Sequence, residues 1–75
     1  MRYPVRNLLL ETAIKRVLNV RMMVVRQRQR IERLRNLKCD TRSAEQILQE
    51  LENSLATLEL HERELKERFN SRQRH

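Results

Sequence analysis

The sequence of 75 residues contains no glycine and only one proline, Pro4. Glycine and proline are the residues that most often make tight turns and interrupt helices. The commonest residues instead are Arg, Leu and Glu, and Gln is also frequent; all four favour helices. The composition therefore predicts long helices and argues against strands and tight glycine turns.

Cysteine and aromatic residues are also scarce. The single cysteine, Cys39, excludes an internal disulfide and fits a reducing compartment. The aromatic residues are Tyr3 and Phe69 alone. A chain this short seldom buries enough apolar surface to be stable without a disulfide, a metal or a partner chain. We therefore expect one small domain, residues 1–75, that gains stability from a partner.

Long hydrophobic runs are missing as well. A membrane span needs roughly 18 apolar residues, and charged residues interrupt the richest stretch. These are Glu11, Lys15, Arg16 and Arg21. The first residues, MRYPVRNLLLETAIKR, lack the apolar core and cleavage site of a secretory signal. We therefore expect no membrane span and a cytoplasmic location.

The net charge of +7 is unevenly distributed between the two halves of the chain. Residues 1–38 carry eleven Lys and Arg against two Glu, which gives +9, whereas residues 39–75 carry six against eight, which gives −2. The two halves therefore attract each other.

Two heptad repeats occupy these halves. In the first, steps of three and four residues join Leu10, Ala13, Val17, Val20, Val24, Gln27, Ile31 and Leu34. In the second they join Ala44, Leu48, Leu51, Leu55, Leu58, Glu62, Leu65 and Phe69. Such spacing marks positions a and d, so it predicts a helix over about 7–38 and a second over about 42–70, followed by a frayed tail over 71–75.

The turn between the helices is predicted at residues 39–41. Asp40, Thr41 or Ser43 can accept hydrogen bonds from the first backbone N–H groups of the second helix, and Ser43 with Gln46 matches a capping box. A connection this short forces the helices to run antiparallel. The predicted fold is an all-α antiparallel two-helix hairpin of coiled-coil type.

One register aligns seven layers of the two repeats. The layers are Leu34 with Leu48, Ile31 with Leu51, Gln27 with Leu55, Val24 with Leu58, Val20 with Glu62, Val17 with Leu65 and Ala13 with Phe69. The flanking e columns then pair Arg35 with Glu45, Arg28 with Glu52 and Arg21 with Glu59. Exposed ion pairs contribute only some tenths of a kcal/mol each, so they choose the register more than they stabilise it.

The first helix carries apolar residues that this hairpin does not use. Ile14, Leu18, Met22 and Val25 lie to one side of the heptad columns, and Leu9 and Met23 lie to the other. One antiparallel neighbour cannot cover both sides, and a helix that is apolar on most faces is normally buried on most faces. We predict that Ile14, Leu18, Met22 and Val25 contact another chain, most simply a second copy in a dimeric four-helix bundle.

Three alternatives to this contact stay open. The partner of the helix is a different protein, or the apolar residues are scattered surface residues without a role. A membrane-surface helix is the third, since Lys15, Arg16 and Arg21 suit anionic lipid, although the usual aromatic anchors are missing.

Three further arginines, Arg26, Arg30 and Arg33, lie on the outside of the first helix, away from the glutamate column. Such a triplet can neutralise phosphates, and the sequence pI of about 11.0 permits nucleic-acid binding. No zinc-finger spacing, recognition-helix motif or aromatic stacking residue accompanies it. A solvated face or an acidic protein partner is the competing interpretation.

The residues able to do chemistry are few and dispersed. Cys39, His61 and His75 are far apart along the hairpin, so no metal site, cofactor site or catalytic arrangement can be assembled from them. Glu62 lies near the open end, where its charge can reach water or Arg16. Gln27 in the core stripe is interpreted as a device that fixes register. The sequence predicts no enzyme.

Residues 31–68, IERLRNLKCDTRSAEQILQELENSLATLELHERELKER, resemble short uncharacterised bacterial proteins with the pattern "I..L...G.DT..AE.LL..LE..L..H...L". The matching positions are Ile31, Leu34, Asp40, Thr41, Ala44, Glu45, Leu48, Leu51, Leu55, Leu58, His61 and Leu65. Lys38 and Cys39 stand where the pattern often has glycine, so the turn takes another path or holds a non-glycine residue at positive φ. The resemblance implies a helical hairpin in a bacterial cytoplasm and no activity.

In architecture, though not in residues, the predicted dimer is also similar to plasmid-encoded RNA-binding hairpins that form four-helix bundles. We expect a small non-enzymatic interaction or adaptor module that self-associates through the N-terminal half of the first helix. The alternative is a hairpin dimer that binds RNA or DNA through Arg26, Arg30 and Arg33.

Overall fold

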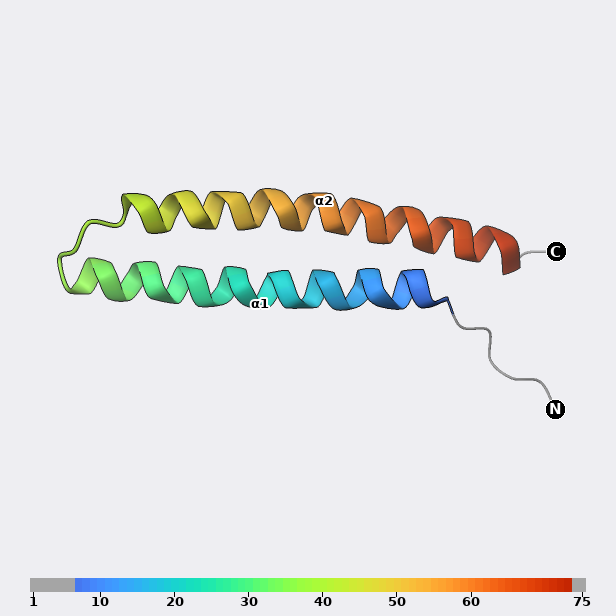
Figure 1. Cartoon of the computed structure of the whole chain (residues 1–75), viewed down its shortest axis with the longest axis horizontal. Helices are drawn as coiled ribbons and strands as arrows, with labels where there is room; N and C mark the ends of the chain where they lie inside the picture. Colours follow the sequence, from blue (N-terminus) through green and yellow to red (C-terminus); the bar gives the residue numbers. More distant parts are fainter. Residues whose placement is uncertain (1–6, 74–75) are drawn as a thin grey trace, which may run out of the picture.

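The computed structural model describes residues 7–73, which form two long helices joined by a short turn (Figure 1). Helix α1 spans Leu8–Asn36 and helix α2 spans Arg42–Gln73. They pack side by side and run in opposite directions, so the start of α1 and the end of α2 lie at the same end. The prediction of an all-α antiparallel hairpin is confirmed.

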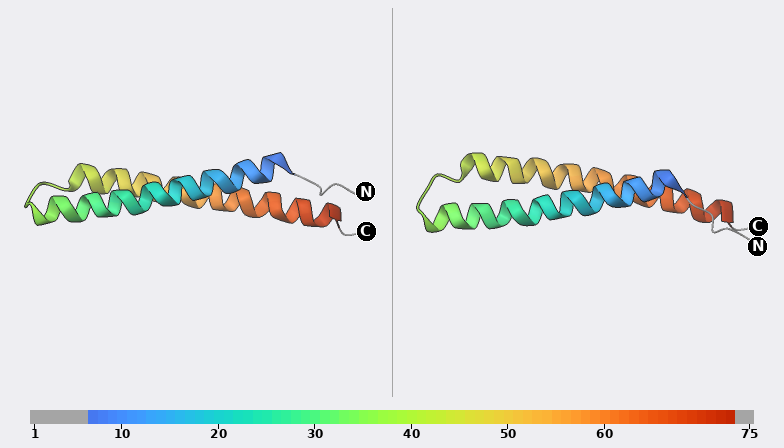
Figure 2. Two further views of the ribbon diagram at one scale, coloured as in Figure 1. Left: turned by 90° about the horizontal axis from the view of Figure 1, so that it is seen from below. Right: turned by 60° about the horizontal axis from the view of Figure 1, so that its bottom comes forward.

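The two helices are not strictly parallel in space. Figure 2 shows them crossing at a shallow angle, so that each helix changes sides relative to the other along the hairpin. Shallow crossing is the packing expected when heptad columns interlock, because the supercoil keeps the a and d positions in contact over the whole length.

Helix α1 begins where the sequence predicts it. Asn7 is the N-cap, and its side-chain oxygen accepts a hydrogen bond from the Leu10 backbone N–H at 3.1 Å. Glu11 lies in the first turn, where a negative charge suits the positive end of the helix dipole. The cap satisfies one of the four N–H groups that a helix start leaves without an internal partner.

Helix α1 ends at Asn36, two residues before the predicted end. The Lys38 N–H donates to the Arg35 carbonyl at 2.9 Å, and the Cys39 N–H donates to the Leu34 carbonyl at 2.9 Å. Lys38 has a φ of 59°, in the left-handed region that helix ends usually give to glycine. This is a Schellman motif with lysine in the glycine position, the second of the two turn paths that the sequence left open.

Helix α2 begins at Arg42, as predicted, and Asp40 is the residue, among the three candidates named from the sequence, whose side chain accepts a hydrogen bond from its first turn. An Asp40 carboxylate oxygen accepts from the Arg42 backbone N–H at 3.0 Å, and the Thr41 carbonyl accepts from the Glu45 N–H at 2.8 Å. The predicted capping box of Ser43 and Gln46 is wrong, because Ser43 lies inside the first turn of the helix. Asp40 forms the turn through its own side chain instead.

The predicted end of the second helix at Asn70 is also wrong. Helix α2 continues to Gln73, so residues 71–73 belong to the helix and not to a frayed tail. No glycine or proline interrupts this segment, and Arg72 in the last turn suits the negative end of the helix dipole. Residues 74–75 of the predicted tail lie outside the described residues.

The core is the seam in which the a and d positions of α1 meet the a and d positions of α2. The buried residues are Ala13, Val17, Val24, Ile31, Ala44 and Leu65, all of which the heptad pattern placed at a or d. The central leucines of α2, Leu48, Leu51, Leu55 and Leu58, are half-buried. The small side chains of α1 are thus covered by the larger ones of α2, which keep one edge toward solvent.

The three predicted ion pairs between the helices are confirmed. Arg35 contacts Glu45 at 2.6 Å, Arg28 contacts Glu52 at 3.1 Å, and Arg21 contacts Glu59 at 2.8 Å. We call Arg21, Arg28 and Arg35 the paired arginines. All six side chains keep a large part of their surface in solvent, so each pair contributes some tenths of a kcal/mol.

The predicted register of the layers is wrong. The Gln27 side-chain N–H donates to the Ala44 backbone carbonyl at 2.8 Å. If Gln27 lay opposite Leu55, Ala44 would be eleven residues away, about 16 Å along the axis, which is beyond the reach of glutamine. A shift of one heptad meets the requirement, because it puts Gln27 opposite Leu48 and Ile31 opposite Ala44.

The shape of the hairpin agrees with this shift. In Figure 1 the end of α1 extends past the start of α2 at the turn, so the helices are not aligned end to end. Ile31 and Ala44 are both buried, as a facing pair would be. A shift of seven residues keeps the same a and d columns in contact, which is why the seam prediction holds although the register does not.

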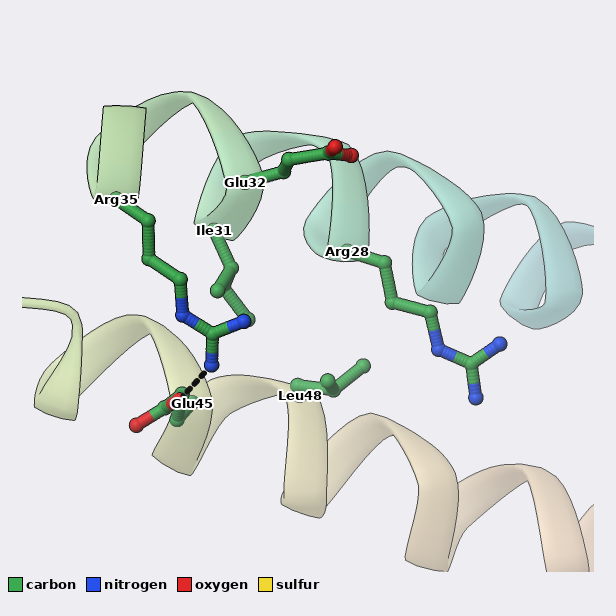
Figure 3. A pocket seen from close by; sticks show the side chains of 6 residues that line it. All are labelled: Arg28, Ile31, Glu32, Arg35, Glu45 and Leu48. Atoms are coloured by element: carbon green, nitrogen blue, oxygen red, sulfur yellow. Dashed lines mark hydrogen bonds and ion pairs between the residues drawn. The ribbon is translucent and has the colours of Figure 1, made fainter. Parts of the chain in front are cut away.

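Long arginine side chains explain how the ion pairs survive the shift. Figure 3 shows the Arg35 side chain extending along the hairpin toward the level of Ile31 before its guanidinium meets Glu45. Helical side chains lean toward the N-terminus of their own helix, so an arginine reaches a carboxylate about a turn away. The same three pairs therefore form in the shifted register.

Candidate protein interface

Four of the apolar residues of α1 that lie outside the seam follow one another on the same side of the helix, and we call Ile14, Leu18, Met22 and Val25 the apolar strip. Leu18 is 56% exposed, Met22 is 52% and Val25 is 48%, while Ile14 is half-buried. The strip begins one turn and a half into α1 and ends just past its middle. The structure thus brings the predicted interface residues onto one stretch of helix surface that α2 leaves uncovered.

The contrast between Val17 and Leu18 shows how sharp the boundary is. Val17 is 1% exposed, whereas the next residue, Leu18, is 56% exposed. Successive residues are turned by about 100° around a helix, so Val17 faces α2 while Leu18 faces away from it. The exposure of the strip follows from its place on the helix rather than from loose packing.

The edge between the seam and the strip is occupied by an ion pair. Arg21 belongs to the column next to the strip, and its guanidinium contacts Glu59 of α2 at 2.8 Å. The ion pair therefore lies between the seam and the strip, and the described residues of α2 leave Leu18 and Val25 exposed.

Charged residues lie near both ends of the strip. Lys15 lies near its start and Glu32 lies beyond its end, and both side chains are exposed. Within the described part of the chain, neither makes an ion pair or a hydrogen bond through its side chain. Glu11, in the first turn of α1, places a further negative charge beyond the start of the strip.

Several other large apolar side chains are exposed singly. They are Leu8, Leu9, Met23, Leu37, Ile47 and Leu60. Leu9 and Met23 were expected from the sequence, whereas the last three were missed. Leu37 and Ile47 fall in the g columns beside the seam, so extending the heptad assignment to the flanking columns would have found them. Leu60 faces outward on α2, where only its position in the heptad signals it.

A second surface is formed by Arg26, Arg30 and Arg33, which we call the outer arginines. All three are exposed. None makes an ion pair with another described residue, in contrast to the paired arginines on the opposite flank of the same helix. The prediction that the triplet lies away from the glutamate column is confirmed.

The hollow shown in Figure 3 lies beside the turn and is lined by both helices. Its lining residues are Arg28, Ile31, Glu32, Arg35, Glu45 and Leu48. Arg28 and Arg35 are held by glutamates of α2, so their charges are already neutralised there. The hollow therefore lies along the row of interhelical ion pairs.

The residues considered for chemistry do not come together. Among residues 7–73, no three His, Cys, Asp or Glu side chains are grouped as a metal site. Cys39 is a free thiol exposed at the turn, His61 is exposed on α2, and His75 lies outside the described residues. Glu62, 15% exposed at its side chain, pairs with Lys66 of its own helix at 3.3 Å rather than with Arg16.

The Asp40 carboxyl has a pKa below its usual range. Its side chain accepts hydrogen bonds from the Arg42 guanidinium at 3.0 to 3.2 Å and from the Arg42 backbone N–H. These bonds, the guanidinium first, lower the pKa of Asp40, against a small opposing effect of burial. They favour the ionised carboxylate and hold the start of α2 in place.

No protein-family model, curated protein or solved structure matches this chain. The resemblance of residues 31–68 to short bacterial proteins therefore stays a prediction. Neither α1 nor α2, over the residues described, is long and apolar enough to cross a membrane.

Proposed function

We propose that this protein is a small non-enzymatic interaction module that self-associates through the apolar strip into a dimeric four-helix bundle. The observation that carries the proposal is the exposure of Leu18, Met22 and Val25 beside a complete seam. A hairpin of two helices has one seam, and α1 carries apolar residues for a second. A second copy supplies a surface of the same kind, which a two-fold interface requires.

The energy available from the strip sets the strength of the contact. Completing the burial of three half-exposed side chains contributes on the order of 1 kcal/mol each, so two copies gain about 6 kcal/mol. Association costs about 4 to 15 kcal/mol in lost freedom, and flanking contacts must add to the gain. We therefore expect a weak dimer with a dissociation constant of micromolar or above.

An antiparallel arrangement of the two copies of α1 brings Lys15 of each copy toward Glu32 of the other. Such a contact between opposite charges at the rim of the strip is favourable. The strip also stands apart from the outer arginines, so the positive charge of the molecule does not concentrate in the contact.

Sedimentation equilibrium of the full chain tests the proposal directly. The chain has a mass of 9.2 kDa, and we expect the apparent mass to approach twice that value as the concentration rises to several hundred micromolar. The double variant Leu18→Glu, Val25→Glu should remain monomeric, because it places four carboxylates in the contact of two copies.

The chain offers a matched control on α2. Leu60 and Ile47 are 52% and 48% exposed, close to the values of Leu18 and Val25. The variant Ile47→Glu, Leu60→Glu therefore removes the same amount of exposed apolar surface, and we expect it to dimerise like the natural chain. A natural chain that stays monomeric overturns the proposal. So does equal loss of dimer in both variants, which would indicate unspecific apolar association.

A further inference from the structure

Six of the seven arginines of α1 fall into two sets of three with opposite environments, and the seventh, Arg16, lies nearer the start of the helix. The paired arginines each meet a glutamate of α2 within 3.1 Å. The outer arginines, Arg26, Arg30 and Arg33, are exposed and make no ion pair in the described part of the chain. Internal pairing therefore neutralises one set of three charges and leaves the other set available to a partner.

The carboxylates that form ion pairs in the described part of the chain are engaged by other residues. Glu45, Glu52 and Glu59 of α2 hold the paired arginines, Glu62 holds Lys66, and Asp40 in the turn holds Arg42. Glu32 is the one carboxylate within the stretch of the outer arginines, so three positive charges stand there against one negative charge.

The spacing of the outer arginines suits a row of phosphates. Steps of four and three residues on a helix separate their alpha carbons by about 6 and 4.5 Å along the axis. The row of about 10 Å spans roughly three phosphates of one strand of a duplex. Arginine also donates two parallel hydrogen bonds to a phosphate, a geometry that lysine cannot provide.

The surroundings of the outer arginines favour a nucleic acid over a membrane. Between Arg26 and Asn36 no large apolar side chain is exposed. The exposed apolar residues that flank this stretch are Met23 and Val25 before it and Leu37 after it. A helix that lies on a membrane needs an apolar face to insert beside its basic residues. The stretch RQRQRIERLRN has none on its outer side, so its attraction is to charge alone.

We infer that the outer arginines are a binding site for the phosphate backbone of a nucleic acid, which they contact without regard to base sequence. The inference does not depend on self-association, because one hairpin carries the whole triplet. Each bound arginine displaces counterions from the backbone, so the affinity falls with salt by a power of about 0.9 for each phosphate neutralised. Three arginines thus account for about a 40-fold loss of affinity between 50 and 200 mM salt.

Fluorescence anisotropy with labelled 30-base-pair DNA and RNA duplexes tests the site across this salt range. The variant Arg26→Gln, Arg30→Gln, Arg33→Gln should bind far more weakly at 50 mM salt and lose about 2.7 from the slope of log affinity against log salt. The matched variant Arg21→Gln, Arg28→Gln, Arg35→Gln removes the same charge and should keep most of the slope. Circular dichroism checks that both remain helical.

The design separates a local site from net charge. Equal loss of slope in the two triple variants overturns the inference, because it shows that only the total charge matters. If the paired-arginine variant unfolds, Arg63→Gln, Arg68→Gln, Arg72→Gln removes three exposed charges from α2 and takes its place. Absence of duplex binding at 50 mM salt, or binding only to phosphatidylserine vesicles or polyglutamate, also overturns it. Binding of either DNA or RNA supports it, since both share the phosphodiester chemistry.

Discussion

The two sides of α1 carry the same kinds of residue in opposite circumstances. Toward α2, Val17 and Val24 are buried and the paired arginines meet glutamates. On the side away from α2, Leu18 and Val25 are half-exposed and the outer arginines have no ion-pair partner among the described residues. One helix thus presents a completed surface and an unfinished one of similar composition.

The comparison teaches that composition alone does not show which residues of a helix are available to partners. Position in the heptad decides it, because a and d residues face the neighbouring helix and e residues reach its charges. The strip and the outer arginines lie mainly at b, c and f, where the hairpin offers them no neighbour. The following predictions test this separation, beginning with the largest expected effect.

The largest expected difference in stability is between a variant with a charge on the buried side of α1 and a variant with a charge on its exposed side. Val17→Asp buries a carboxylate in the seam at a cost of several kcal/mol, which a hairpin this small cannot offset. We expect most of its helical signal to be lost in far-UV circular dichroism at 25 °C. Leu18→Asp, one residue later, should keep its helical signal. Similar losses in the two variants would show that the strip is as buried as the seam.

Gln27 is the polar exception on the side that faces α2. Gln27→Leu removes the hydrogen bond to the Ala44 carbonyl and adds apolar surface to the seam. We expect the free energy of unfolding, measured in urea, to rise by about 1 kcal/mol. The register should become less well defined, because a heptad shift no longer breaks a hydrogen bond.

The definition of the register is measured with two spin labels. They are attached to cysteines introduced by Gln29→Cys and Gln49→Cys, in a chain that also carries Cys39→Ser. Double electron–electron resonance should give one narrow distance distribution in the chain that keeps Gln27 and a broader distribution in the Gln27→Leu variant. A narrow distribution at the same distance in both chains would mean that other contacts fix the register.

The arginines give a smaller contrast in stability. Arg28→Gln breaks an exposed ion pair and should cost up to about 1 kcal/mol at low salt. Arg30→Gln, which breaks none, should leave the melting temperature unchanged or raise it slightly. Thermal melts at low and high salt check this, since screening should remove most of the difference. A loss at Arg30 equal to that at Arg28 would contradict the assignment of the two sets.

The smallest effect is expected at the turn, where Asp40 joins the two helices. Its pKa is lowered in the folded chain, so its contribution to stability is present above the unfolded-state pKa of about 4. That contribution is lost as the pH falls through the lower, folded-state pKa. Melts between pH 6 and 2 should show the natural chain losing more stability than Asp40→Asn. Parallel curves would show that the Asp40 carboxylate does not stabilise the turn.

The hairpin, its seam and its ion pairs could be predicted because each leaves a periodic signal in the sequence. Leucines and valines at steps of three and four define the seam, and arginines facing glutamates in the e columns define the pairs. The exposure of Leu18, Met22 and Val25 followed from the same periodicity, since they are surplus to one seam. The periodicity of the sequence does not identify a partner for these side chains.

The register and the choice between the two turn paths could not be predicted, for two physical reasons. A shift of one heptad returns every a and d column to an equivalent place, so periodicity cannot distinguish Leu48 from Leu55 as the neighbour of Gln27. The choice depends on the path of the turn, where Lys38 adopts a positive φ and α1 ends two residues early. That path depends on backbone hydrogen bonds, which side-chain pattern does not encode.

The position of the turn also has a consequence for how the chain folds. Arg35 and Glu45 are only ten residues apart, whereas Arg21 and Glu59 are 38 apart, so closing the first contact costs less chain entropy than closing the second. We expect the pairing of the two helices to begin at the turn around Lys38 and to proceed toward the termini. Leu18 and Met22 then lie in the half of the hairpin that pairs last. A second copy that docks on them would bind the chain before this half is fully paired, and its binding would complete the folding.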